Sequence, residues 1–382
     1  MQLTSKLPHV GLTIFGKMSQ MAHEHQAINL SQGFPDFEVA PELIACVHHY
    51  MQQGKNQYPP MMGIPELRKA IAQKIQRCHD WLPDTEQHIM VTCGAIEAIF
   101  SSLTALVHPG DEVILMDPAY DAYEPIVHLQ GAKAIHVPLK EKNYAIDWEA
   151  VERAISPKTR MIMINTPHNP SGAIISKDDL VALERLTEGT DILILSDEVY
   201  EHIVFDGNEH HSVLRSAALR KRAVATFSFG KTFHATGWRM GYLVAPEVLM
   251  AEIKKVHQYN TFTIHAPTQY ALADYLQTPA HYENLGAMYQ EKRDVFLKAM
   301  EVTDFEPVPS KGSYFQLMSY ANISDRHDVE MAEWLTKEIG VASIPTSVFH
   351  ADGRDDKVLR FCFAKQEDTL KKAAEMLSKC FV

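Results

Sequence analysis

The chain has 382 residues, of which 46% are hydrophobic and 22% are charged, and its formal net charge is −12. This length and apolar content provide enough material for two domains with buried cores. The acidic balance argues against an extended surface for nucleic acid or an anionic membrane, which requires clustered basic residues. We therefore expect a small metabolite as the partner.

The cysteines and histidines give no sign of a disulfide framework or a metal site. The cysteines are odd in number and lack zinc-type spacing: Cys46, Cys78, Cys93, Cys362 and Cys380. The 20 histidines are dispersed and form no His-Glu-x-x-His pattern. Residues 1–15 lack the features of an export signal, and no segment is apolar for long enough to span a bilayer. We expect a cytoplasmic protein without a bound metal.

A series of short apolar runs dominates the first two thirds of the chain. They cover residues 88–92, 113–116, 161–164, 192–195 and 223–227. Helical patterns and turn residues separate them, which is typical of parallel strands buried on both faces. The sequence therefore predicts an α/β fold built on a wound sheet.

The last third of the chain has a different pattern. Helices are expected over residues 269–276, 287–300 and 329–339, with strands over 314–318 and 358–363. This mixture predicts a smaller α+β domain. We place the large domain at residues 34–275, and the small domain at residues 276–382 together with an N-terminal arm of residues 1–33.

Ligands of wound sheets bind beyond the carboxyl ends of the strands, so the residues that follow the apolar runs are the candidates for chemistry. The last run ends in Ser228-Phe229-Gly230-Lys231-Thr232. Its Gly-Lys-Thr triplet is not a nucleotide-binding loop, because Ala225 stands where the first glycine of that motif is required. A lysine at a strand end is instead suited to forming an imine with an aldehyde.

The neighbours of Lys231 fit pyridoxal 5'-phosphate (PLP) as that aldehyde. Arg239 and the Ser228 hydroxyl can hold a phosphate, as can the backbone N–H groups of residues 94–96 at the start of an expected helix. Asp197, at the end of a buried run, can pair with the pyridine nitrogen. Each residue alone also has a plain structural explanation, such as Asp197 capping a helix.

Taken in order, these motifs resemble the class I aminotransferases of PLP fold type I over nearly the whole chain. The motifs are Asn169-Pro170-Ser171-Gly172, Asp197-Glu198-Val199-Tyr200, Ser228-Phe229-Gly230-Lys231, Gly237-Trp238-Arg239-x-Gly241 and Arg360. The resemblance implies a large domain with a mostly parallel central sheet, a smaller α+β domain, and a homodimer whose subunits share their active sites.

The resemblance also implies roles for individual residues. The catalytic residues would be Lys231, which carries the cofactor and moves the proton, Asp197, which pairs with the pyridine nitrogen, and Tyr200. Cofactor binding would further involve Asn169 and Tyr200 at O3', Tyr120 stacked on the ring, Gly94, Ala95, Ile96, Ser228 and Arg239 at the phosphate, and Tyr58 from the second subunit. The substrate would meet Arg360 at its α-carboxylate, together with Gly33, Asn169 and Phe15.

The N-terminal region narrows the resemblance. Residues 30–37 and 256–258 resemble the branch that contains methionine aminotransferases and kynurenine aminotransferases. Residues 258–267 contain no arginine that could bind a second carboxylate, which disfavours a dicarboxylic donor. Methionine is the predicted donor, with aromatic amino acids, histidine and kynurenine as related candidates. The alternatives are kynurenine–oxoglutarate transamination, β-elimination from cysteine S-conjugates, and a PLP-binding regulatory protein without activity.

Four further residues are open to two interpretations. They either line a substrate pocket or fill an interface, and they are Phe15, Tyr259, Phe262 and His265.

Overall fold

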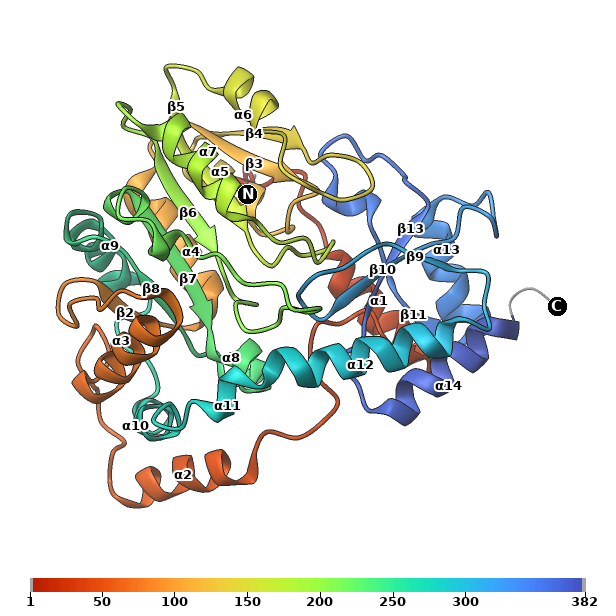
Figure 1. Ribbon diagram of the computed structural model, residues 1–382, viewed down its shortest axis with the longest axis horizontal. Coiled ribbons are helices and arrows are strands. Elements are labelled where there is room, and N and C mark those ends of the chain that lie inside the picture. Colours follow the sequence, from red (N-terminus) through yellow and green to blue (C-terminus); the bar gives the residue numbers. More distant parts are fainter. Residues whose placement is uncertain (1–2, 380–382) are drawn as a thin grey trace.

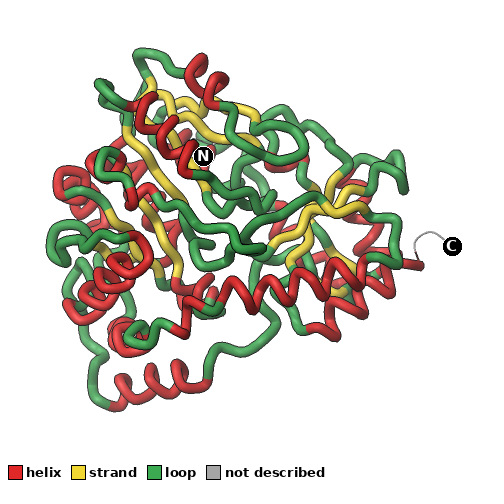
Figure 2. Tube along the Cα trace, in the orientation of Figure 1, coloured by secondary structure: helices red, strands yellow, loops and turns green. Residues whose placement is uncertain are grey.

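The computed structural model describes residues 3–379, and Cys380 lies outside the described residues. These described residues form one seven-stranded sheet, one four-stranded sheet and a two-stranded sheet, with helices packed around them (Figure 1). Loops fill much of the region between the two larger sheets (Figure 2). Among the described residues, no helix has both the length and the apolar character needed to cross a membrane.

The seven-stranded sheet has the order β2-β8-β7-β6-β5-β3-β4. Its strands are β2 (Ile89–Thr92), β3 (Glu112–Asp117), β4 (Lys133–Pro138), β5 (Thr159–Asn165), β6 (Leu193–Asp197), β7 (Ala223–Ser228) and β8 (Gly241–Val244). Strand β8 is antiparallel to both of its neighbours, β2 and β7. Strands β2 and β7 therefore run in the same direction. The other pairs are parallel. The carboxyl ends of six strands therefore lie at one edge, and the predicted mostly parallel sheet is confirmed.

Alternate residues of these strands belong to two separate hydrophobic cores, one on each face of the sheet. In β5, for example, Ile162 and Ile164 join one core, and Met161 and Met163 join the other. Burial on both faces explains why the strands appear in the sequence as continuous apolar runs. The edge strand β4 is only partly buried and gives no such run, whereas β8 is buried at all four positions and its apolar residues were not predicted as a strand.

Helices α1–α10 belong to the first 275 residues. They are α1 (Ile14–Glu24), α2 (Pro41–Gln52), α3 (Pro65–His79), α4 (Gly94–Leu106), α5 (Tyr123–Leu129), α6 (Trp148–Ala154), α7 (Lys177–Thr187), α8 (Phe229–Thr232), α9 (Glu247–Asn260) and α10 (Ala266–Tyr275). Short 3-10 turns cover Val213–Arg215, Leu219–Lys221 and Thr236–Trp238. Helices α4, α5 and α9 contribute to one core, whereas α3 and α7 contribute to the other.

The four-stranded sheet is antiparallel, in the order β12-β13-β10-β9. Its strands are β9 (Glu306–Pro307), β10 (Phe315–Ser319), β12 (Ile344–Pro345) and β13 (Val358–Cys362). The helices of this region are α11 (Ala280–Glu283), α12 (Leu285–Met300), α13 (Asp328–Trp334) and α14 (Glu367–Ser378), with a π-helical turn at Leu335–Ile339 and a 3-10 turn at Ser347–Phe349. The strands expected over residues 314–318 and 358–363 are confirmed as the neighbours β10 and β13.

The N-terminal segment joins the C-terminal part of the chain. Strand β1 (Ile28–Asn29) pairs in parallel with β11 (Val341–Ala342). This pairing brings the residues after β1 close to β13, where the Cys362 N–H donates to the Leu30 carbonyl at 2.8 Å. The arrangement is compatible with an arm at residues 1–33 that belongs with residues 276–382, and these domain boundaries stay a prediction.

A buried ion pair lies next to the segment that follows β6. The Lys74 ammonium of α3 is 2.6 Å from one carboxylate oxygen of Glu201, and His79 Nε2 is 3.3 Å from the other. Lys74 is only 3% exposed. Burial raises the pKa of the Glu201 carboxyl, but the Lys74 ammonium, His202 and His79 together outweigh this effect and the pKa ends well below its ordinary value. The pair anchors the chain directly after Tyr200.

Replacing Lys74 with methionine is expected to lower the free energy of unfolding by about 3–5 kcal/mol, because it leaves the Glu201 charge buried without its partner. The folded pKa of Glu201 is depressed, so the contribution of the pair is present above the unfolded pKa of about 4.3 and is lost as pH falls through the folded pKa. Urea unfolding at pH 7.5 measures the effect.

Lys255→Met is the matched control, since Lys255 forms an exposed pair with Glu252 at 2.7 Å. Exposed pairs of this kind contribute about 0–1 kcal/mol. Equal loss of stability in the two variants would contradict a dominant role for the buried pair.

Candidate active site

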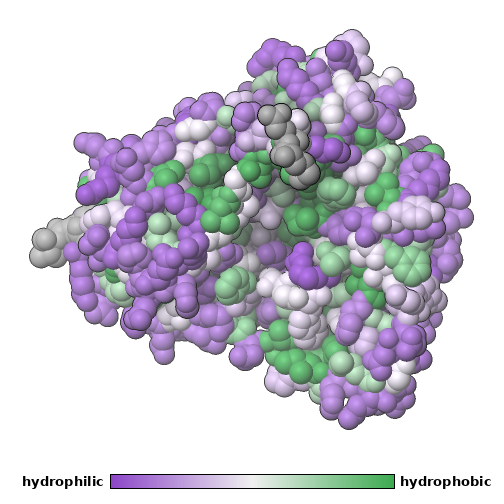
Figure 3. All heavy atoms as spheres, turned by 180° about the vertical axis from the view of Figure 1, so that it is seen from behind, coloured by the Kyte–Doolittle hydropathy of each residue, from purple (hydrophilic) through white to green (hydrophobic). Residues whose placement is uncertain are grey.

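A cavity of about 290 Å³ lies at the carboxyl ends of β5, β6 and β7, where the sequence predicts the site. Twelve of the predicted residues line it: Phe15, Gly33, Ala95, Ile96, Tyr120, Asn169, Asp197, Tyr200, Ser228, Lys231, Arg239 and Arg360. Six other lining residues were not assigned from the sequence: Gln32, Ile99, Tyr123, Asn165, Val199 and Phe315. On the reverse face the molecule is hollowed near its centre, with hydrophobic residues along part of the hollow (Figure 3).

Lys231 projects into this cavity from α8, directly after β7. The Ser228 hydroxyl caps α8 by accepting a hydrogen bond from the Lys231 backbone N–H at 3.3 Å. The Lys231 amine donates to the Tyr314 hydroxyl at 2.7 Å and to the Gly33 carbonyl at 3.1 Å. Burial lowers the pKa of Lys231 to about 8. A sizeable fraction of the amine is therefore neutral near pH 7.5, as a nucleophile or base requires.

Asp197 ends β6 and is buried beside a tyrosine that the sequence did not indicate. The Tyr123 hydroxyl donates to Asp197 Oδ2 at 2.6 Å, and the Val199 N–H donates to Oδ1 at 3.3 Å. Burial raises the pKa of the Asp197 carboxyl to about 6, while the hydrogen bond from Tyr123 and the Lys231 charge oppose the rise. The carboxylate is thus held in a fixed direction and suits a cationic or protonated partner.

Asn165 connects the ends of two neighbouring strands. Its side-chain amide donates to the Asp197 carbonyl at 2.9 Å, and its oxygen accepts from the Asn169 N–H at 2.7 Å. The Asn169 side-chain oxygen in turn accepts from Arg360 at 2.8 Å. This bonding leaves the Asn169 NH₂ group as the donor available to the cavity.

Arg360, on β13, is a buried cation in an aromatic wall. It is 1% exposed, and its guanidinium carbon lies 3.9 Å from the ring centre of Phe315 and 5.0 Å from that of Phe15. One terminal nitrogen donates to Asn169 and the other donates to the Ser31 carbonyl at 2.8 Å. Within residues 3–379 no carboxylate forms a salt bridge with it. A buried guanidinium with neutral partners is suited to binding a carboxylate in two parallel hydrogen bonds.

Arg239 and the start of α4 form a cradle for a larger anion. Gly94 begins this 13-residue helix with a φ of +70°, and a Cβ there would lie 2.6 Å from a terminal nitrogen of Arg239. A Cβ on Gly241 would lie 2.9 Å from the Gly94 carbonyl carbon. Both glycines therefore permit a guanidinium and a strand to approach a helix N-terminus, whose free N–H groups and dipole favour a phosphate. Gly94 itself is not among the residues that line the cavity.

Besides Gly94, Tyr58 is the predicted site residue that the cavity lining does not include. It is 83% exposed, and its ring centre lies 5.6 Å from that of Phe262. Together with His265 it lines an open groove of about 560 Å³. The predicted contact of Tyr58 with the phosphate of a second subunit stays a prediction, as does the interface role of Phe262 and Tyr259.

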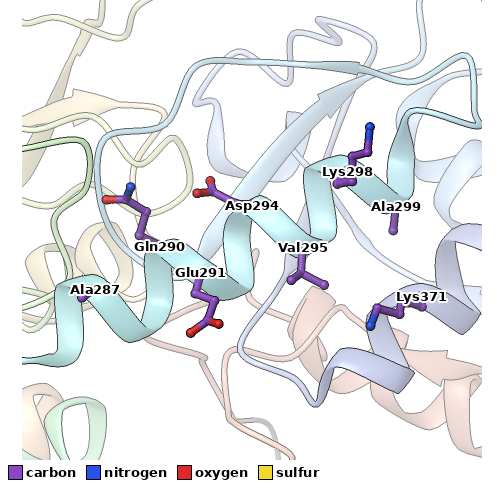
Figure 4. A pocket seen from close by; sticks show the side chains of 8 residues that line it. All are labelled: Ala287, Gln290, Glu291, Asp294, Val295, Lys298, Ala299 and Lys371. Carbon is purple, nitrogen blue, oxygen red and sulfur yellow. The ribbon is translucent and has the colours of Figure 1, made fainter.

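A larger depression, of about 640 Å³, runs along α12 and is not a comparable site. Figure 4 shows its eight labelled residues, which come from α12 and from Lys371 of α14. Their charged side chains point in different directions along the helix instead of converging (Figure 4). The smaller cavity, where an amine, a carboxylate and two guanidinium groups meet, is therefore the candidate active site.

Comparison with known proteins assigns the class that this fold and site define. The family model described as aminotransferase class I and II matches residues 25–377. The chain belongs to this family and is an aminotransferase, and membership implies PLP as its cofactor.

Individual relatives extend over nearly the full length. The methionine aminotransferase of Escherichia coli (strain K12) is 49% identical over 374 residues, which cover 98% of this chain and 97% of the relative. A crystal structure of the E. coli protein YbdL, described as identifying a methionine aminotransferase function, matches with a TM-score of 0.97 and 48% identity and covers 99% of this chain and 100% of that one. The kynurenine–oxoglutarate transaminase of Dictyostelium discoideum is 32% identical, covering 97% of this chain and 94% of its own.

Proposed function

We propose that this enzyme transfers the α-amino group of methionine, and of aromatic amino acids, to a 2-oxo acid, with PLP bound covalently to Lys231. The observation that carries the proposal is the convergence of the Lys231 amine, the buried Asp197 carboxylate and the buried Arg360 guanidinium in one cavity. PLP supplies an electron sink for the substrate's Cα–H electron pair when it is bound. The protein supplies alignment and proton transfer.

The described residues fit such a cofactor at each of its polar groups. Asp197 would pair with the ring nitrogen, because its buried carboxylate is held in place by Tyr123. The NH₂ group of Asn169 and the Tyr200 hydroxyl would donate to the phenolic oxygen. Tyr120 would stack on the ring. The phosphate would be held by Ser228, by Arg239 and by the backbone at residues 94–96, where Gly94 leaves room for the guanidinium.

The charged residues that the cofactor does not use would bind the substrate. Arg360 would take the α-carboxylate, and Lys231, with its pKa lowered to about 8 by burial, would accept the Cα proton as a neutral amine. Among the described lining residues, the third cation besides Lys231 and Arg360 is Arg239, which faces the phosphate cradle. No described lining residue is then left to neutralise a second carboxylate. The remaining wall, with Phe15, Tyr120 and Phe315, suits an apolar or aromatic side chain.

Rates with a panel of amino donors test the proposed substrate class. With one 2-oxo acid held constant, kcat/KM for methionine and phenylalanine is expected to exceed that for aspartate by at least about 100-fold, since an unpaired buried carboxylate costs several kcal/mol. A preference for aspartate would contradict the donor assignment and leave the aminotransferase assignment intact.

Kynurenine–oxoglutarate transamination is the second candidate, because the D. discoideum relative of that name is 32% identical to this chain. β-Elimination from cysteine S-conjugates is a further candidate on chemical grounds. Both reactions use the same lysine and the same loss of the Cα proton. Release of pyruvate and ammonia from a cysteine conjugate, without any 2-oxo acid, would identify β-elimination. Faster turnover of kynurenine than of methionine would identify the kynurenine activity.

A homodimer with shared active sites is also proposed. Its support is the exposure of Tyr58 and Tyr259, at 83% and 87%, beside the open groove that contains His265. In such a dimer Tyr58 would reach the phosphate of the partner. The cytoplasmic location stays a prediction.

A further inference from the structure

Tyr314 is a fully buried residue that touches the reactive amine and that no sequence motif indicated. It directly precedes β10 and is 0% exposed. Its hydroxyl accepts a hydrogen bond from the Lys231 amine at 2.7 Å and donates its own hydrogen to the Gly33 carbonyl. The same carbonyl lies 3.1 Å from the Lys231 amine. Three segments that are far apart in the sequence thus meet at one nitrogen atom.

We propose that Tyr314 is a catalytic residue which, together with the Gly33 carbonyl, fixes the direction of the lone pair of the Lys231 amine during proton transfer. The proposal rests on the proposed function of Lys231 as the base. It deepens that function by naming the groups that orient the base.

The hydrogen atoms at this contact determine which group donates and which accepts. The Gly33 carbonyl can only accept, so the Tyr314 hydrogen that points at it is already committed, and the Tyr314 oxygen can only accept from Lys231. A neutral amine has two N–H bonds and one lone pair. When these two oxygens accept both N–H bonds, the lone pair has a single remaining direction, away from both of them.

The proton transfer then balances at this nitrogen. When the substrate's Cα–H bond breaks, the proton would form the third N–H bond of Lys231, and the electron pair would enter the sink that PLP supplies when it is bound. Two of the three N–H bonds of the ammonium would be held by Tyr314 and Gly33. The third, which came from the substrate, would be the one that Lys231 is free to donate. Orientation of this kind converts a flexible lysine into a positioned acid and base.

The close packing around Gly33 supports a fixed position for its carbonyl group. A Cβ on Gly33 would lie 2.8 Å from the Phe315 ring, so any side chain there would push the carbonyl away from β10. Other charges also bear on the amine: Arg360 and Arg239 lower the pKa of Lys231, and Cys362 and Asp197 raise it. The hydrogen bond to Tyr314 raises the pKa of Lys231 in addition to these charges, because an oxygen that accepts from the ammonium favours the charged form.

A purely structural role is the alternative, because Tyr314 also packs against Tyr200 and Tyr289, with ring centres at 5.1 and 5.7 Å. Tyr289 provides the matched control. It is equally buried at 0% exposure, and its hydroxyl contacts His234 Nδ1 at 3.1 Å instead of Lys231. Tyr314→Phe and Tyr289→Phe each remove one buried hydroxyl and keep the ring.

The test combines kinetics with a measurement on the apo-enzyme. Tyr314→Phe is expected to lower kcat for methionine by about 10- to 100-fold, with KM within about twofold, and to enlarge the isotope effect of α-deuterated methionine, since proton transfer becomes more rate-limiting. In the apo-enzyme, the rate of covalent PLP capture follows the neutral amine, and its pH midpoint is expected to move below the value near 8 of the natural chain. Tyr289→Phe should change neither.

Several outcomes separate the possibilities. An isotope effect and a capture midpoint in Tyr314→Phe that equal those of the natural chain would overturn the proposal. Equal changes in Tyr314→Phe and Tyr289→Phe would also overturn it, because they would reflect packing. If the natural chain transfers no amino group from any donor, the proposed function fails, while the capture midpoint still reports whether Tyr314 orients Lys231.

Discussion

Replacing Lys231 with alanine is expected to reduce amino transfer from methionine by about 10,000-fold or more. The change removes the only amine that the cavity lining provides among the described residues. It would abolish the proposed covalent attachment of PLP and also the proposed acid–base catalysis at Cα, which alone typically contributes about 100- to 10,000-fold. The measurement is the rate of 2-oxo acid formation from methionine, with the PLP content of each preparation determined beforehand.

Lys298→Ala is the matched control, because Lys298 lies on α12 outside the cavity with its side chain 78% exposed. This variant is expected to keep the natural rate. A small primary amine added to Lys231→Ala should restore part of the activity, since it supplies the missing base without the tether. Retention of more than about a tenth of the natural rate by Lys231→Ala would contradict the assigned role.

Replacing Arg360 with lysine is expected to lower kcat/KM for methionine by at least about 100-fold, or ~2.7 kcal/mol at 1.36 kcal/mol per tenfold. Lysine keeps the positive charge, but it cannot form two parallel hydrogen bonds to a carboxylate while also donating to Asn169 and the Ser31 carbonyl. The loss is expected in both half-reactions, because both substrates carry a carboxylate. Steady-state kinetics with methionine and with the 2-oxo acid measure it.

Arg326→Lys makes the same substitution at a comparable arginine. The Arg326 guanidinium lies 4.8 Å from the ring centre of Trp334, outside the lining of the cavity. Natural kinetics in this variant would show that loss of an arginine stacked on an aromatic ring is not by itself harmful. If Arg360→Lys were as active as Arg326→Lys, carboxylate recognition by Arg360 would be wrong.

Strands buried on both faces were predictable because their burial leaves continuous apolar runs in the sequence. All five runs became strands, and a residue within four positions after each run lines the cavity, in agreement with the rule for wound sheets. The edge strand β4 was not predicted, since its partial burial leaves no such run, and the buried β8 was not predicted although its residues are apolar. The helix expected over residues 329–339 is α13, which continues as a π-helical turn at Leu335–Ile339.

Some of the candidate site residues stand in a recognisable sequence motif, and others do not. Lys231, Asp197 and Arg239 stand in motifs at strand ends, so their spacing identifies them. Tyr123 and Tyr314 stand in no such motif. Tyr123 is 74 residues from its partner Asp197 in the sequence, and Tyr314 is 83 residues from its partner Lys231. A tyrosine on the first turn of a helix or before a strand has no local feature that distinguishes it from a packing residue.

The most direct test of the central claim is a single half-reaction with methionine in the absence of any 2-oxo acid. The absorbance of the PLP-loaded enzyme is followed while methionine is added, and the 2-oxo acid formed is quantified. The proposed function predicts that the absorbance band of the bound cofactor converts to that of its aminated form with one equivalent of 2-oxo acid per site. It also predicts that adding a 2-oxo acid reverses the change. An unchanged spectrum with methionine and with phenylalanine, in protein that has bound PLP, would contradict the account.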